Sequence, residues 1–69
     1  MLLADLIKNI RNEYLLTQKD FAECTDVDQV SISFFERGIR KPGKRSLKKI
    51  IDALNLKMGM DLKYSDIEY

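Results

Sequence analysis

The chain has 69 residues, of which 45% are hydrophobic and 33% are charged, and its formal net charge is +1. This length allows one small domain, and the composition is that of a folded globular protein. With no histidine and with Cys24 as the only cysteine, the sequence predicts neither a zinc site nor an internal disulfide, and no apolar run is long enough to span a membrane. We therefore expect a protein of the reducing cytoplasm that uses no metal and no cofactor.

A first helix is expected from about Leu2 to Tyr14. Its apolar residues recur every three or four positions and form one stripe for the core: Leu3, Leu6, Ile7, Ile10 and Tyr14. Charges from Asp5 onward distinguish this segment from a signal peptide. Leu15 and Leu16 then connect it to the next helix.

Two short helices with a tight turn between them are expected from Thr17 to Gly38. The Thr17 hydroxyl is placed to cap the first helix, and Asp20, three residues later, completes a capping-box pattern. Polarity breaks at residues 26–28, where Asp28 is placed to cap the second helix. We expect the rest of the chain to hold this pair of helices in place.

The second of these short helices has two different faces. One face contains residues at positions i, i+3, i+4 and i+7, namely Ile32, Phe35, Glu36 and Ile39. The other face has the same spacing and consists of Val30, Ser33, Phe34 and Arg37, with Gln29 at its N-terminal end. The pattern predicts one face that is buried and another that is presented to a partner.

A loop and a fourth helix are expected next. Residues 39–45 are predicted to form the loop, because Pro42 cannot donate a backbone hydrogen bond and Gly43 relaxes the turn. The helix after it has a regular core stripe of Leu47, Ile50, Ile51 and Leu54. This helix completes the predicted core.

Positive charge is concentrated in one part of the chain. Seven of the twelve basic residues lie between positions 37 and 49, where no acid occurs: Arg37, Arg40, Lys41, Lys44, Arg45, Lys48 and Lys49. A local basic stretch of this kind is typical of proteins that contact the nucleic-acid backbone. Lys48 and Lys49 are expected to be solvated helix charges.

The last part of the chain follows a different pattern. Hydrophobic residues alternate there with other residues and predict a β-strand: Met58, Met60, Leu62 and Tyr64. Because a lone strand needs a neighbour for its backbone hydrogen bonds, we expect it to pair with the same strand of a second copy across a twofold axis. The alternative is a disordered tail, and the acidic ending from Ser65 onward is expected to be frayed.

These motifs occur in a recognisable order. L-T-Q, then F-A, then V-D-Q-V-S-I-S-x-F-E-R-G, then P-G-x-x-S-L-x-x-I resembles the phage repressor/Cro (XRE) class of helix-turn-helix proteins over about Leu6 to Leu56. The resemblance implies an all-α, lambda-repressor-like domain of four to five short helices at residues 1–56, with residues 57–69 as a dimerisation segment. It also implies a largely buried ion pair between Arg11 and Glu36.

The resemblance also implies a DNA interface. Gln29 is expected to read a base, because its amide can bond adenine N7 and N6 together, and Ser33, Val30 and Phe34 are expected to contact the groove beside it. Contacts to DNA phosphates are expected from Thr17, Gln18, Ser31, Arg37, Arg40, Lys41, Lys44 and Arg45. For Phe34, a protein contact or packing into the core are the alternatives to groove contact.

A narrower resemblance concerns the segment LNLKMGMDL. It is similar to HipB-type antitoxins, which are dimeric repressors with a C-terminal strand that pairs across the dimer and are encoded beside HipA-type kinase toxins. This implies a homodimeric repressor of its own operon, a palindromic double-stranded DNA operator and a HipA-like toxin partner. The alternatives are a phage-type or other XRE regulator, or a protein-interaction module of the same fold that binds DNA weakly.

An enzyme is not expected. The sequence has no histidine, no nucleotide-binding glycine loop and no cluster of metal ligands.

Overall fold

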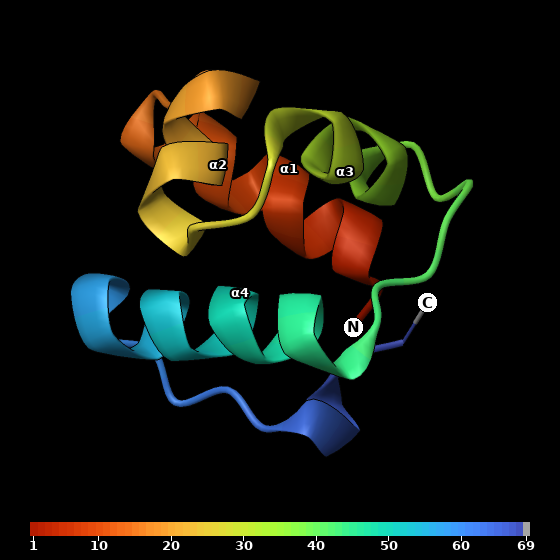
Figure 1. Cartoon of the computed structure of the whole chain (residues 1–69). Coiled ribbons are helices and arrows are strands. Elements are labelled where there is room, and N and C mark those ends of the chain that lie inside the picture. Colours follow the sequence, from red (N-terminus) through yellow and green to blue (C-terminus); the bar gives the residue numbers. More distant parts are fainter. Residues whose placement is uncertain (69) are drawn as a thin grey trace.

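The computed structural model describes residues 1–68, and within this range the chain is almost entirely helical. Four α-helices are followed by a short 3-10 turn: α1 Leu3–Tyr14, α2 Gln18–Thr25, α3 Gln29–Glu36, α4 Lys44–Met58 and η1 Tyr64–Asp66. Helices α1, α2 and α3 form a group that lies across α4, and the residues after α4 run back beneath it (Figure 1). The predicted all-α fold of short helices is confirmed.

The ends of the two short helices are determined by the predicted capping residues. The Thr17 side chain accepts a hydrogen bond from the Asp20 amide at 3.0 Å, and the Asp20 carboxylate accepts one from the Thr17 amide at 3.0 Å. Asp28 caps α3, because its Oδ1 atom accepts a hydrogen bond from the Val30 amide at 2.9 Å. Asp26 ends α2 with a left-handed backbone (φ 57°), which aspartate tolerates better than most residues. The turn between α2 and α3 is therefore short and well defined.

The core is formed by the apolar stripes of all four helices together with residues of the α2–α3 turn and of the C-terminal segment. Its buried side chains are Leu3, Leu6, Ile7, Ile10, Phe21, Ala22, Val27, Ile32, Phe35, Leu47, Ile50, Ile51, Leu54, Leu62 and Ile67. Two residues assigned to these stripes are exposed instead. Tyr14 is the last residue of α1, where the chain turns away, and Ile39 lies beyond the end of α3 at Glu36, so the helical spacing no longer places it on the inner face.

The β-strand predicted for the last part of the chain is wrong for residues 58–64. Met58 is the final residue of α4, Gly59 ends the helix with φ +65°, and no strand is assigned before the η1 turn. The backbone of Leu62 is instead bonded to one side chain, because its N–H donates to Asn55 Oδ1 at 2.8 Å and its carbonyl accepts from Asn55 Nδ2 at 3.0 Å. A side chain thus supplies the partner that a second strand was expected to supply.

The alternation that suggested a strand has another cause. Leu62 and Ile67 are buried in the chain's own core, and Met58 and Met60 pack partly against it, whereas Tyr64 is half exposed. An extended segment that lies along a helical core also alternates between buried and exposed positions. The prediction of a frayed ending is wrong for Ile67, because its side chain is buried in the core. Tyr69 lies outside the described residues.

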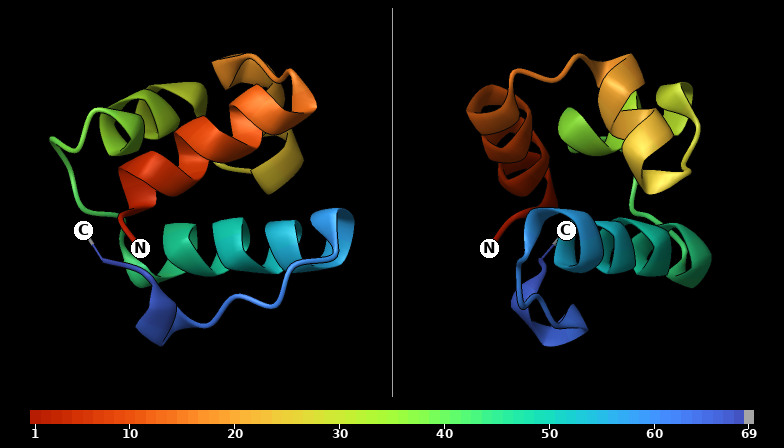
Figure 2. Two further views of the ribbon diagram at one scale, coloured as in Figure 1. Left: turned by 180° about the vertical axis from the view of Figure 1, so that it is seen from behind. Right: turned by 90° about the vertical axis from the view of Figure 1, so that its left-hand side faces the viewer.

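The two ends of the described chain lie side by side (Figure 2). Leu2 and Glu68 form an isolated parallel bridge, in which the Leu3 amide donates to the Glu68 carbonyl at 2.8 Å and the Glu68 amide donates to the Met1 carbonyl at 2.7 Å. The C-terminal segment therefore returns to the start of α1 and closes the lower side of the core.

Candidate nucleic-acid interface

Helix α3 is anchored along one side and exposed along the other. Ile32 and Phe35 are almost completely buried, and α3 packs against both α1 and α2. On the opposite side Gln29 is exposed and Val30 is 61% exposed. With its side chains an α-helix is about 10 to 12 Å across, and the major groove of B-form DNA, which is about 12 Å wide, can admit it. The predicted division into a buried and a presented face is therefore present.

The other two predicted base contacts are less exposed than Gln29 and Val30. Ser33 and Phe34 are both half-buried. The Ser33 carbonyl accepts a hydrogen bond from Arg37 Nε at 3.4 Å. These residues flank the exposed part of α3 rather than form its outermost surface.

The end of α3 is tied to α1 by an ion pair. Arg11 Nη1 lies 2.6 Å from one carboxylate oxygen of Glu36 and 2.7 Å from the other, while Arg11 Nε donates to the Leu16 carbonyl at 3.1 Å. The side chains are 24% and 13% exposed, so the pair is partly rather than fully buried. Removal of one partner leaves the other charge half-buried, which costs about 1 to 3 kcal/mol. This pair orients α3 and is not available to a ligand.

Phe34 has a specific set of neighbours. The guanidinium carbon of Arg37 lies over its ring at 5.3 Å from the centroid, and that of Arg40 lies over it at 5.2 Å. Both distances are within the range of cation–π interactions. The spacing of Phe34 and Arg37, three residues apart at the end of α3, could have indicated the first contact, because Arg37 directly follows the helix. The path of the loop that brings Arg40 to the ring could not be predicted from the sequence.

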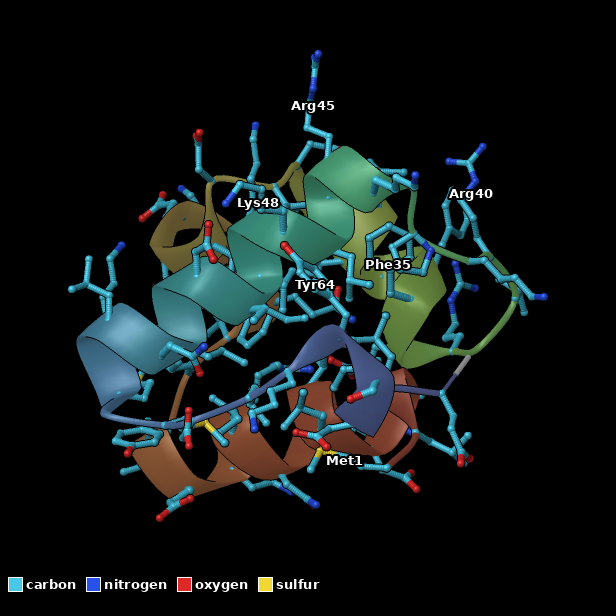
Figure 3. The ribbon with its side chains drawn as sticks, turned by 90° about the horizontal axis from the view of Figure 1, so that it is seen from below. Met1, Phe35, Arg40, Arg45, Lys48 and Tyr64 are labelled. Atoms are coloured by element: carbon cyan, nitrogen blue, oxygen red, sulfur yellow. The ribbon has the colours of Figure 1, made fainter. Side chains whose placement is uncertain are left out.

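The predicted basic segment is exposed. Among residues 1–68 no salt bridge engages its members, which are Arg37, Arg40, Lys41, Lys44 and Arg45. Arg40 from the loop and Arg45 from the start of α4 project outward, away from the ribbon (Figure 3). Lys48 and Lys49 differ from them, because Lys48 lies 2.7 Å from Asp52 and Lys49 lies 3.5 Å from Asp26. Free cationic groups are thus concentrated between α3 and the first turn of α4.

Both aspartates of the turn between α2 and α3 interact with other residues of the chain. Asp26 lies 3.5 Å from Lys49, and Asp28 caps α3. The Asp28 carboxylate accepts a hydrogen bond from the Ser31 hydroxyl as well as capping α3. These bonds, with the Ser31 hydroxyl first, and the charge of Arg40 lower the pKa of Asp28 below its ordinary value despite some desolvation. Because the Ser31 hydroxyl proton is used here, the Ser31 side chain has no free donor for a phosphate.

The remaining predicted phosphate contacts, Thr17 and Gln18, lie at the start of α2. Thr17 is exposed and Gln18 is half-buried, and the capping box leaves the Thr17 hydroxyl proton free to donate. The hydrogen bond from the Thr17 backbone amide lowers the pKa of Asp20 more than any other contact does. The N-terminal end of α2 can therefore offer one hydroxyl donor and an amide side chain.

Comparison with known proteins identifies the class of this domain. The chain matches the Helix-turn-helix (HTH_3) family over residues 7–59, a range that contains α2, α3 and α4. Neither a curated protein nor a solved structure matched the chain. None of the helices within residues 1–68 has the length and apolar character required to cross a lipid bilayer. The chain belongs to the XRE-type helix-turn-helix family of DNA-binding regulators.

Proposed function

We propose that this protein is a sequence-specific transcriptional repressor that inserts α3 into the major groove of its operator. One observation carries the proposal: α3 is held from behind by Ile32 and Phe35, while Gln29 and Val30 face outward beside a basic segment that forms no ion pair within the described residues 1–68. A rigid helix with a polar reader at its first turn is what base recognition requires.

The roles of the individual residues follow from their chemistry. Gln29 reads an adenine through its amide, and Val30 contacts a thymine methyl group or the sugar backbone. Phosphates are bound by Arg37, Arg40, Lys41, Lys44 and Arg45, with Thr17 and Gln18 on the other side of the groove. Ser33 contacts the edge of the groove with its hydroxyl.

We propose that the protein binds a palindromic operator as a homodimer. One eight-residue helix reads too few base pairs to select a single site, so two copies with half-sites about one turn, or roughly 34 Å, apart supply the missing specificity. The exposed side chains of Leu2 and Ile39 border a hollow of about 430 Å³ that is also lined by Phe35 and Gly38 at the end of α3 and by Arg40 and Lys41 of the basic segment. Contact with a second copy at this hollow keeps the two α3 helices near the twofold axis, and it replaces the strand pairing that we expected at residues 58–64.

The finer proposal is that the operator is the protein's own and that the protein is an antitoxin of the HipB type. Its support is the segment LNLKMGMDL at the end of α4. It predicts an adjacent gene for a HipA-like kinase and co-purification of the two products. Absence of such a neighbour favours a phage-type or other stand-alone XRE regulator and leaves the proposed DNA binding intact.

Selection of bound sequences from a random pool of duplex DNA tests the proposed function. We expect a palindrome with half-sites about one helical turn apart. Replacement Gln29→Ala is then expected to weaken binding to the selected site by about 1 to 3 kcal/mol with little effect on random DNA. Asn12→Ala, which removes an exposed amide from α1, is the matched control and should change neither. Equal affinity of the wild-type protein for all sequences, or no effect of Gln29→Ala, contradicts sequence readout and favours a protein-interaction module.

A further inference from the structure

We propose that Phe34 is a positioning residue, whose ring holds the guanidinium groups of Arg37 and Arg40 in place for DNA phosphates and does not itself read a base. The inference deepens the proposed function and rests on it. It assigns a role to Phe34 other than groove contact, protein contact or core packing.

The geometry places both arginines on the same ring. Their guanidinium carbons lie 5.3 and 5.2 Å from the Phe34 centroid. Phe34 itself is half-buried on α3, next to the buried Phe35. The ring is therefore a fixed support, whereas both arginine side chains remain exposed to solvent.

The backbone after α3 explains how Arg40 reaches the ring. Gly38 adopts φ +71°, which reverses the direction of the chain. The Ile39 amide then donates to the Phe34 carbonyl at 3.2 Å, and the Gly38 amide donates to the Phe35 carbonyl at 3.1 Å. These bonds hold the start of the loop against the end of α3, so Arg40 is directed back toward Phe34.

An arginine that lies over an aromatic ring can keep hydrogen-bond donors free. A cation–π interaction uses the flat face of the guanidinium group, while its N–H donors lie in the plane at the edge and match the oxygens of a phosphate. Arg11 shows the opposite arrangement, because Glu36 and the Leu16 carbonyl occupy its Nη1 and Nε atoms. Arg37 Nε donates to the Ser33 carbonyl at 3.4 Å, so Arg37 keeps only its two terminal nitrogens for a phosphate. The position over the ring thus restricts both flexible side chains before DNA binds and leaves these donors available.

The groups around the stack support this role. Among residues 1–68 no carboxylate forms a salt bridge with Arg37 or Arg40. The nearby carboxylate of Asp28 feels the charge of Arg40, but its oxygens accept hydrogen bonds from Val30 and Ser31. Because two guanidinium groups lie over the ring, a thymine methyl would have to compete with them for contact with it.

Nuclear magnetic resonance of the free protein tests the stack without DNA. In the wild type, ring currents should shift the side-chain protons of Arg37 and Arg40 upfield, and Phe34→Leu should abolish both shifts while Phe34→Tyr retains them. Unshifted arginine protons in the wild type overturn the inference whatever the DNA experiments show.

DNA binding at several salt concentrations tests the consequence. Phe34→Leu should weaken binding to the selected operator and to random DNA by the same factor, about five- to tenfold, and lower the magnitude of the log–log salt slope. Phe34→Tyr should restore both. A loss confined to the selected operator, with an unchanged slope, shows that Phe34 reads a base and overturns the inference.

A substitution in the loop covers the case in which Phe34→Leu impairs folding. Arg40→Lys keeps the charge but removes the planar group, and it should weaken binding to both DNAs about threefold with normal circular dichroism. Unchanged affinity of Arg40→Lys overturns the inference. If the wild type shows no salt-dependent DNA binding at all, the proposed function fails, and the ring-current shifts still show whether the stack exists.

Discussion

The helix-turn-helix unit, α2 and α3 with their turn, and the C-terminal segment 59–68 are both held by hydrogen bonds from side chains to backbone, but they serve different purposes. In the first, Thr17 and Asp28 cap helices whose outer surface stays free. In the second, Asn55 binds the backbone of Leu62, and the segment covers the core and reaches the start of α1. One region presents a surface and the other closes the domain, so substitutions in the two regions should have separable effects on DNA binding and on stability.

The largest expected effect on stability comes from the C-terminal segment. Leu62→Ala removes a side chain that is only 9% exposed, and it should lower the free energy of unfolding by about 2 to 4 kcal/mol. The same replacement at Leu56, which is 83% exposed, should change it by less than about 0.5 kcal/mol. Chemical denaturation measures both, and the DNA affinity of the folded Leu62→Ala protein should equal that of the wild type. Equal stability of the two variants means that the segment does not close the core.

The next effect is expected in the basic segment and should concern DNA alone. If each protomer neutralises about four phosphates, a dimer has a log–log salt slope of roughly −7, and Arg45→Gln should reduce its magnitude by about 2. Lys48→Gln is the matched control, because Lys48 is paired with Asp52, and it should leave the slope nearly unchanged. Binding titrations from low to moderate salt measure the slopes. Similar slopes for the wild type, Arg45→Gln and Lys48→Gln would show that Arg45 does not contact a DNA phosphate.

The smallest effect is expected at acidic pH. Hydrogen bonds depress the pKa values of Asp20 and Asp28 below the ordinary 3.8, so their ionised forms stabilise the fold above that pH, and this contribution is lost as the pH falls through the lower, folded-state values. The unfolding free energy of the wild type should therefore decrease more steeply below pH 4 than that of the variant Asp20→Asn, Asp28→Asn. Parallel pH profiles of the two proteins contradict a stabilising role for these caps.

The helix-turn-helix unit could be predicted because its local signals agree with its packing. The capping pattern of Thr17 and Asp20, the cap at Asp28 and the helical spacing of Ile32 and Phe35 all indicate the same arrangement, and all are present. A segment can be predicted when its capping residues, its helical spacing and its packing all indicate the same structure.

The C-terminal segment could not be predicted in the same way. A two-residue period reports alternate burial, and it does not report which group satisfies the backbone. The hydrogen bonds between Asn55 and Leu62 join residues seven positions apart through one side chain, and no local pattern indicates them. The contact between Arg40 and Phe34 depends in the same way on the path of a loop.

If α3 and the basic segment after it form the DNA-binding surface, their backbone amides should respond first to added operator. The most direct measurement is a map of backbone amide chemical shifts as the selected operator duplex is added to isotopically labelled protein. We expect the largest changes at residues 29–34 and 37–45 and only small changes over residues 59–68. Changes concentrated on the outer face of α1 or in the C-terminal segment, with α3 unaffected, would contradict this expectation.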